Sequence, residues 1–73
     1  MTRLKYERLK RELSLQTLGY QAQVQSADVS KIERRIFTGY PSQRERLAQV
    51  LDIEPEQLLA EVSADEVLEV SRV

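Results

Sequence analysis

The sequence predicts a single all-α domain of five short helices, followed by a short C-terminal tail. A chain of 73 residues is long enough for one domain with a small core and too short for two. Apolar residues recur at helical spacing through most of the chain. Residues that favour helix starts stand before several of these segments, among them Thr2, Ser14 and Ser42. We expect the domain to cover residues 1–62 and the tail to cover residues 63–73.

The first helix is expected to begin after Thr2, whose side chain can cap it, and to end near Glu12. Its inner face is expected to carry, on or beside it, three apolar side chains: Leu4, Leu9 and Leu13. Its outer face is basic and carries Arg3, Lys5, Lys10 and Arg11.

The second and third helices are predicted to form a helix-turn-helix, two short helices joined by a tight turn. Ser14 can cap the second helix, over residues 15–21, and Leu18 and Ala22 face inward. A glycine inside a helix costs about 1 kcal/mol relative to alanine. Gly19 therefore indicates that the two helices pack closely at this point.

The third helix is predicted over about residues 25–35. Its inward side chains are expected to be Val24, Val29 and Ile32, and its outward ones Ser26, Ala27, Asp28, Lys31 and Arg35. Small side chains at the start of such a helix allow its backbone to approach base edges in the major groove of DNA. Lys31 can donate to guanine O6 or N7, and Asp28 can accept from cytosine N4. An ordinary surface helix is the alternative interpretation.

Residues 34–41 are predicted to form a loop, because Gly39 and Pro41 favour turns and the segment has no helical spacing. Three of its polar side chains are expected to reach phosphates: Arg34, Arg35 and Thr38. Three apolar side chains are expected to pack against the core: Ile36, Phe37 and Tyr40.

A fourth helix is predicted to open with a capping box from Ser42 to Glu45 and to end near Leu51. Its buried residues are expected to be Leu47, Val50 and Leu51. Glu54 and Pro55 start a fifth helix, because proline favours the first helical position and an acidic residue is stabilising at a helix N-terminus. The inner face of this helix is expected to hold Leu58, Leu59 and Val62.

The tail allows two interpretations. Residues 63–66 can form a capping box for a short helix that presents Val67, Leu68 and Val70. Residues 67–73 are alternatively rich in β-branched side chains and suited to a strand added to a partner's. In either form the tail has more apolar residues than a solvated segment requires, so it is a candidate dimerisation element. A frayed terminus is the alternative.

The composition argues against an enzyme. The chain has no His and no Cys, which removes the usual zinc ligands, the thiol nucleophile and the commonest general base. We therefore expect no catalytic residues, no metal and no cofactor. No apolar run approaches the roughly 18 residues of a membrane span, and the charged N-terminus lacks the apolar core of a signal peptide. We expect a cytoplasmic protein that does not contact membranes.

Charge is unevenly distributed along the chain. Residues 1–46 contain ten Lys or Arg and five Asp or Glu, a balance of +5. Residues 47–73 contain one Arg and seven acidic residues, a balance of −6. This asymmetry indicates a basic working surface and an acidic remainder. Charged residues that merely solvate helix surfaces are the alternative explanation.

The segment from Leu13 to Glu33 resembles the helix-turn-helix of the Cro/phage-repressor (XRE-type) family. The residues that carry the resemblance, at matching spacing without a gap, are Leu13-Ser14, Leu18-Gly19, Val24, Val29-Ser30 and Ile32-Glu33. A second stretch, residues 53–59 (Ile-Glu-Pro-Glu-Gln-Leu-Leu), is similar to the junction of the family's fourth and fifth helices. The resemblance covers residues 3 to about 61 and implies a compact five-helix, lambda-repressor-like fold.

The resemblance also implies which residues bind DNA. It implies base contacts from the third helix by Gln25, Ser26, Ala27, Asp28 and Lys31. It implies phosphate contacts by Ser14, Gln16, Arg34, Arg35 and Thr38. Arg8 and Glu33 match family residues that commonly form an ion pair, which is better understood as fixing the geometry of the third helix than as net stabilisation.

Four positions depart from the family pattern. Leu15 stands where the family has glutamine, which is displaced to Gln16. Gln23 stands at the turn position usually held by glycine and needs a left-handed backbone, at a cost of about 1 kcal/mol. Asp28 repels phosphate, and Arg35 replaces the glycine usually found after the third helix.

Two classes of function remain. The first is a sequence-specific transcriptional regulator, expected to be a repressor, that binds double-stranded DNA. It is expected to bind as a homodimer to an inverted repeat with half-sites about 34 Å, or a multiple of that distance, apart. A phage repressor, a restriction-modification controller and an antitoxin all fit this class. The second class is a protein-interaction module on the same fold, such as an antitoxin or anti-repressor whose acidic half binds a protein partner.

Overall fold

The computed structural model describes residues 1–71 of the chain, with side chains as far as Val67. Its elements are α1 (Arg3–Lys10), α2 (Leu15–Ala22), α3 (Ser26–Glu33), α4 (Pro41–Leu51), the 3-10 turn η1 (Pro55–Gln57) and α5 (Ala64–Ser71). The described residues contain no strand and only one isolated antiparallel bridge, between Thr2 and Glu61. The predicted all-α fold is confirmed. Among the described helices, none has the length and apolar character that crossing a membrane requires.

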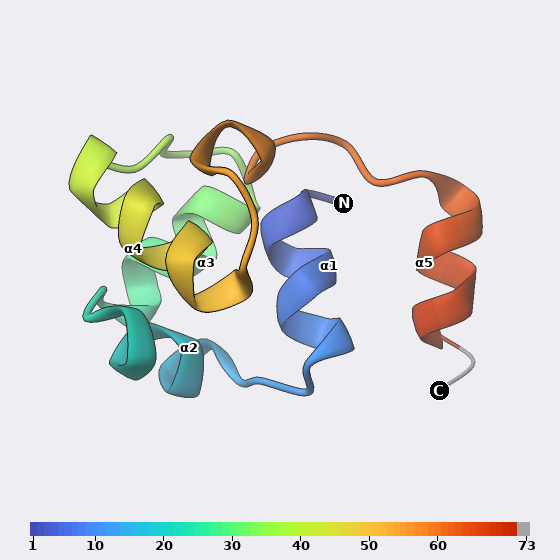
Figure 1. Ribbon diagram of the computed structural model, residues 1–73, viewed down its shortest axis with the longest axis horizontal. Helices are drawn as coiled ribbons and strands as arrows, with labels where there is room; N and C mark the ends of the chain where they lie inside the picture. Colours follow the sequence, from blue (N-terminus) through green and yellow to red (C-terminus); the bar gives the residue numbers. More distant parts are fainter. Residues whose placement is uncertain (72–73) are drawn as a thin grey trace.

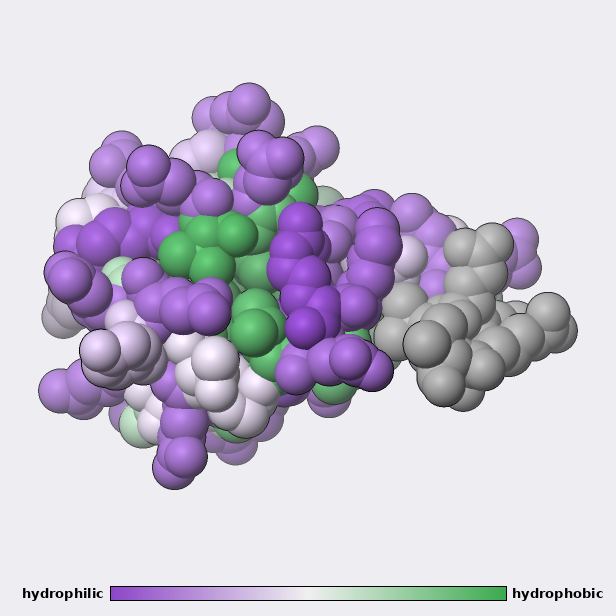
Figure 2. All heavy atoms as spheres, turned by 60° about the horizontal axis from the view of Figure 1, so that its bottom comes forward, coloured by the Kyte–Doolittle hydropathy of each residue, from purple (hydrophilic) through white to green (hydrophobic). Residues whose placement is uncertain are grey.

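Helices α1 to α4 surround one core, and α5 lies to the side, next to α1 (Figure 1). The core is formed by apolar side chains from these four helices, from the α2–α3 turn and from the segment after η1. They are Leu4, Leu18, Ala22, Val24, Val29, Ile32, Leu47, Ala48, Leu51 and Leu58. On one face, apolar side chains remain visible between the hydrophilic ones (Figure 2), as expected for a domain of this size.

The first helix is shorter than predicted. Thr2 caps it as expected, and its hydroxyl accepts a backbone hydrogen bond at 3.2 Å. However, α1 ends at Lys10, and Glu12 adopts a left-handed backbone with φ 56°. Leu9, expected on or beside the inner face, is 36% exposed and does not belong to the core. Leu9 lies five positions after the buried Leu4, a spacing that turns it away from the core face of a helix.

The turn between α2 and α3 has the predicted left-handed residue. Gln23 ends α2 with φ 57° and ψ 44°. The backbone N–H of Val24 donates to the carbonyl of Gly19 at 2.8 Å. The guanidinium of Arg46 donates to the carbonyls of Ala22 and Gln23 at 3.0 and 3.4 Å. These bonds satisfy carbonyls at the end of α2 and hold the tight turn in place.

The start of α4 differs from the prediction. The helix begins at Pro41, before the predicted capping box at Ser42, because proline suits the first helical position. The side-chain oxygen of Gln43 accepts a hydrogen bond from the backbone N–H of Tyr40 at 3.0 Å, which satisfies the entry to the helix. Val50, predicted to be buried, is half-buried.

The predicted fifth helix is reduced to the single turn η1. The chain leaves helical geometry after this turn, where backbone carbonyls accept hydrogen bonds from the start of α1 instead of from a next helical turn. The carbonyls of Leu58 and Ala60 accept hydrogen bonds from the backbone N–H groups of Leu4 and Arg3, at 2.9 and 2.8 Å. Two of the predicted inner residues, Leu58 and Val62, are buried, and Leu59 is half-buried.

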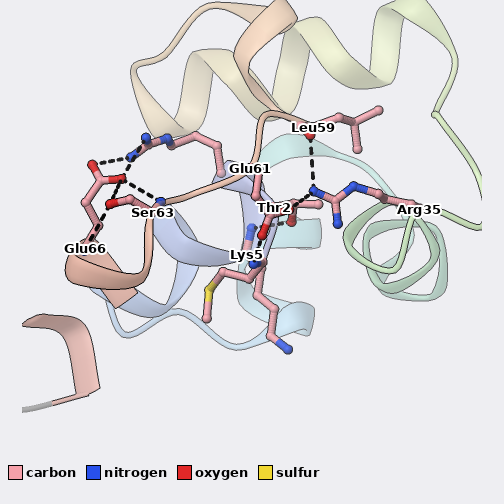
Figure 3. A network of polar contacts seen from close by, with 9 residues as sticks. Thr2, Lys5, Arg35, Leu59, Glu61, Ser63 and Glu66 are labelled. Atoms are coloured by element: carbon pink, nitrogen blue, oxygen red, sulfur yellow. Dashed lines mark hydrogen bonds and ion pairs between the residues drawn. The ribbon is translucent and has the colours of Figure 1, made fainter. Parts of the chain in front are cut away.

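The tail forms the helix α5, so the strand is not observed over residues 64–71. The predicted capping box is present, since the backbone N–H of Glu66 donates to Ser63 Oγ at 3.3 Å and that of Ser63 donates to Glu66 Oε2 at 3.2 Å. Arg3 on α1 donates to both carboxylate oxygens of Glu66 at 3.3 Å (Figure 3). Hydrogen bonds from Arg3 and from the Ser63 backbone hold the pKa of Glu66 below its usual value. The apolar surface predicted for Leu68 and Val70 lies outside the described side chains, and residues 72 and 73 lie outside the described residues.

Candidate nucleic-acid interface

Helix α3 buries one side and leaves the other accessible. Val29, Ile32 and Glu33 are buried. Three of the predicted base-contacting residues are exposed: Gln25, Ala27 and Lys31. The other two, Ser26 and Asp28, are half-buried. The exposed side therefore carries small and uncharged residues at the start of the helix and a cation one turn later.

Helices α2 and α3 approach each other at Gly19, as the sequence predicts. A Cβ atom at this position would lie 2.5 Å from the carbonyl oxygen of Val24 and 3.3 Å from the backbone nitrogen of Ser26. Both are backbone atoms, which cannot move aside without shifting α3. The absence of a side chain at Gly19 thus sets how α3 stands on α2.

An open hollow of about 690 Å³ lies between α2 and the start of α3. It is lined by Gln16, Gly19, Tyr20, Gln21, Gln23, Val24, Gln25 and Ser26. Because Gln16 shares this hollow with Gln25 and Ser26, predicted phosphate-contacting and base-contacting residues open onto one surface. None of the described lining residues is charged, so this surface can offer hydrogen bonds but no cation.

Tyr20 is the large side chain of this surface that was not among the predicted contacts, and neither were the exposed Gln21 and Gln23. Its side chain is 86% exposed and lines the hollow. A position two residues from the buried Leu18 and two from the buried Ala22 faces away from the core. Helical spacing alone was therefore a sufficient signal to find it.

Ser14 stands at the N-terminus of α2, where it is used as a cap. Its Oγ accepts a hydrogen bond from the Thr17 backbone N–H at 3.0 Å and donates to Thr17 Oγ1 at 2.9 Å. The backbone N–H groups of Leu15 and Gln16 begin the helix and have no acceptor within it. A phosphate at the start of α2 would therefore bind to the backbone amides more readily than to the Ser14 hydroxyl.

The implied ion pair between Arg8 and Glu33 is present. Arg8 donates from Nε to Glu33 Oε2 at 2.7 Å and from Nη2 to Oε1 at 3.0 Å. A third nitrogen, Nη1, donates to the carbonyl of Leu13 at 2.9 Å. The two side chains are only 11% and 5% exposed. This single guanidinium joins α1, the α1–α2 turn and the end of α3.

Asp28 is engaged by α4. The side-chain nitrogen of Gln43 donates to Asp28 Oδ2 at 3.1 Å, while the Gln43 oxygen holds the start of α4. One carboxylate oxygen of this predicted base contact is therefore already in use.

Several arginines of the basic half are used inside the fold. Arg35, predicted to contact phosphate, donates to Glu61 Oε2 at 2.6 Å and to the Leu59 carbonyl at 3.4 Å (Figure 3). Hydrogen bonds from the N-terminal ammonium and from Arg35 lower the pKa of Glu61 from its usual value. Arg44 donates to the carbonyls of Thr38 and Gly39, at 3.3 and 2.6 Å. The positive surface is consequently smaller than the charge count suggests.

Two exposed cations remain on α3 and at its end. Lys31 is exposed and forms no ion pair within the described part of the chain. Arg34 is exposed, and its Nε donates to the Ser30 carbonyl, at 3.3 Å. Thr38 is also exposed, in the loop that follows.

The expectation that three apolar loop residues pack against the core is wrong for two of them. Ile36 and Tyr40 are 66% and 64% exposed, and only Phe37 packs against the core. Arg35 adopts a left-handed backbone with φ 60°, and the N–H groups of Ile36 and Phe37 both donate to the Lys31 carbonyl. This turn folds the loop back on α3 and leaves Ile36 exposed while Phe37 packs against the core.

Comparisons with known proteins identify no family: no family model, no curated protein and no solved structure matches the chain. Within the described residues, no group of three or more His, Cys, Asp or Glu side chains is placed to hold a metal ion. A functional assignment therefore depends on the surface formed by α2 and α3.

Proposed function

We propose that this chain is a cytoplasmic, sequence-specific DNA-binding transcriptional regulator, a repressor of the Cro/phage-repressor type, that inserts α3 into the major groove. The observation that carries the proposal is the exposed side of α3. Its start bears the small side chains of Ser26 and Ala27, and Lys31 follows one turn later on the exposed side. A helix with this profile allows close backbone approach and gives one donor to a base edge.

The position of α3 relative to α2 supports the same proposal. Close contact at Gly19 and the left-handed turn at Gln23 join the two helices through a minimal connection. The amides at the start of α2 then face the DNA backbone while α3 enters the groove. In this arrangement Gln16, Arg34 and Thr38 contact phosphates, and Gln25, Ser26, Ala27 and Lys31 face the bases.

The experiment that tests the proposal is selection from a randomised duplex library at about 0.15 M salt, followed by sequencing. Enrichment of an inverted repeat with half-sites about one helical turn apart is the expected result. A folded protein that enriches no sequence would refute the proposal.

Lys31→Ala is expected to alter specificity at one base pair of each half-site. Loss of a donor to guanine should weaken binding by about 1–3 kcal/mol for the preferred base pair and relax the preference at that position only. The measurement is a binding titration against duplexes that carry each base pair in turn. A specificity profile identical to that of the wild type would contradict the position of α3 in the groove.

Arg34→Ala is expected to weaken binding to all DNA sequences by a similar factor. Because it removes one phosphate contact per protomer, the slope of log K against log salt should become shallower by about 0.9 per protomer. Fluorescence anisotropy between about 0.05 and 0.2 M salt measures this slope. Lys5→Ala on α1 provides the matched control, since it removes an exposed cation from another helix. Equal changes in slope for both variants would argue against a specific contact by Arg34.

A homodimer is part of the proposal, and α5 is its candidate element. Apart from its end near Arg3, α5 stands beside the domain rather than in its core (Figure 1). Truncation after Val62, which keeps that buried residue, is expected to lower self-association without unfolding the domain. Sedimentation velocity over a range of concentrations measures the association. An unchanged association state would exclude α5 as the dimer element.

A second candidate function is a protein-interaction module on the same fold. Two observations favour it: the hollow between α2 and α3 has no charged lining residue among those described, and few arginines are available to phosphates. The acidic residues that are exposed after α4, such as Asp52, Glu54 and Glu56, would then bind a basic partner. Absence of any enriched duplex, combined with a partner captured only when these acids are intact, would favour this function.

A further inference from the structure

A second hollow, of about 400 Å³, lies beside the proposed base-contacting surface. It is lined by Asp28, Lys31, Ile36, Phe37 and Tyr40. Two of these residues, Asp28 and Lys31, lie on the side of α3 that the proposed function places in the groove. The hollow therefore opens toward the same ligand, with an apolar wall that this function does not yet use.

The apolar wall is held on a fixed backbone. The N–H groups of Ile36 and Phe37 donate to the Lys31 carbonyl at 3.0 and 3.4 Å. The rings of Phe37 and Tyr40 meet edge to face, with centroids 5.3 Å apart and planes at 77°. Arg44 ties the carbonyls of Thr38 and Gly39 to α4. A loop held by these contacts presents Ile36 and Tyr40 to solvent without first having to be ordered.

We propose that Ile36 is a specificity-determining residue that contacts the C5 methyl group of a thymine beside the base pair read by Lys31. Thymine is the base that presents an apolar group in the major groove, and its O4 acceptor lies next to that methyl. The apolar wall formed by Ile36, Phe37 and Tyr40 is complementary to this methyl group, next to the base pair that Lys31 contacts. The proposal deepens the proposed function and rests on it.

The Asp28 carboxylate also fits this arrangement. Its Oδ2 accepts a hydrogen bond from Gln43 at 3.1 Å, which fixes the position of the carboxylate in the lining of the hollow. Lys31, which has no ion pair in the described chain, remains available to the base. The hollow thus offers the ligand an apolar wall beside one cation and one carboxylate.

The test replaces each thymine of the selected duplex by uracil, which removes only the methyl group, and measures binding of the wild type and of Ile36→Ala. At one thymine of each half-site, uracil should weaken wild-type binding about three- to fivefold. Ile36→Ala should bind the thymine and uracil duplexes equally well. Leu9→Ala, at an exposed apolar position on α1, is the matched control and should keep the wild-type preference.

Four results would overturn the inference. If uracil never weakens wild-type binding, or if Ile36→Ala retains the preference for thymine, Ile36 does not contact the methyl group, although the proposed function stands because binding is still measured. If Ile36→Ala instead lowers self-association in the absence of DNA and keeps the thymine preference, the patch is a protein interface. If the wild type binds no selected duplex, the inference and the proposed function fail together.

Discussion

Arg8→Ala is expected to lower the free energy of unfolding by about 3–5 kcal/mol, because it leaves the Glu33 carboxylate buried without its partner. The Glu33 side chain is 5% exposed and receives two hydrogen bonds from Arg8. A chain of 73 residues is expected to have a total stability of about 4–11 kcal/mol. The variant should therefore lose a large fraction of the total stability and unfold at a markedly lower urea concentration than the wild type. Urea denaturation followed by far-ultraviolet circular dichroism measures the loss.

Two further variants separate the buried charge from a general loss of packing. Arg3→Ala, which removes the more exposed pair with Glu66, should have a clearly smaller effect. The double variant Arg8→Met with Glu33→Leu should recover much of the stability lost by Arg8→Ala, because an apolar pair replaces both charges. If Arg8→Ala is as stable as the wild type, the pair does not anchor α3 to α1.

Gly19→Val is expected to lower the free energy of unfolding by about 3 kcal/mol and to impair DNA binding more than stability alone explains. Its Cβ would lie 2.5 Å from the Val24 carbonyl oxygen, so α2 and α3 must separate. Valine also gains less helix propensity over glycine than alanine does, so little of the cost is offset. Urea denaturation gives the stability, and binding to the selected duplex at a temperature where the variant is folded gives the functional loss.

Gly19→Ala provides the graded comparison. It introduces the same Cβ but gains about 1 kcal/mol of helix propensity, so its loss of stability should be smaller than that of the valine variant. A larger loss of duplex affinity for valine than for alanine, with both proteins folded, is expected if the angle between α2 and α3 sets the fit to DNA. Wild-type stability and affinity in both variants would contradict the close approach.

The helix-turn-helix was predictable because its signals are local. The Ser14 cap, the spacing of Leu18, Val29 and Ile32, and Gly19 all lie within about twenty residues. Each was observed in its expected role. The predicted left-handed Gln23 shows that tertiary packing can impose a conformation that its side chain disfavours. The helix after Glu54 was overestimated because local signals did not include the hydrogen bonds that its carbonyls make to the start of α1.

The availability of the charged residues was less predictable. Arg35 and Glu61 are 26 positions apart, and Asp28 and Gln43 are 15 apart, so no periodic pattern connects them. A charge count treats Arg35 and Lys31 alike. Among the described residues, however, Arg35 forms an ion pair with Glu61, and Lys31 forms none. The exposure of Ile36 was missed for a related reason, because apolar character predicts burial unless the loop geometry is known.

Helix α3 is proposed to lie in the major groove, and protection from dimethyl sulfate on the selected duplex is the measurement that probes this placement. This reagent methylates guanine N7 in the major groove and adenine N3 in the minor groove. Bound wild-type protein should protect guanine N7 in each half-site, and Lys31→Ala should lose protection at one guanine per half-site. Protection confined to adenine N3, or identical guanine protection with and without the Lys31 side chain, would contradict the claim.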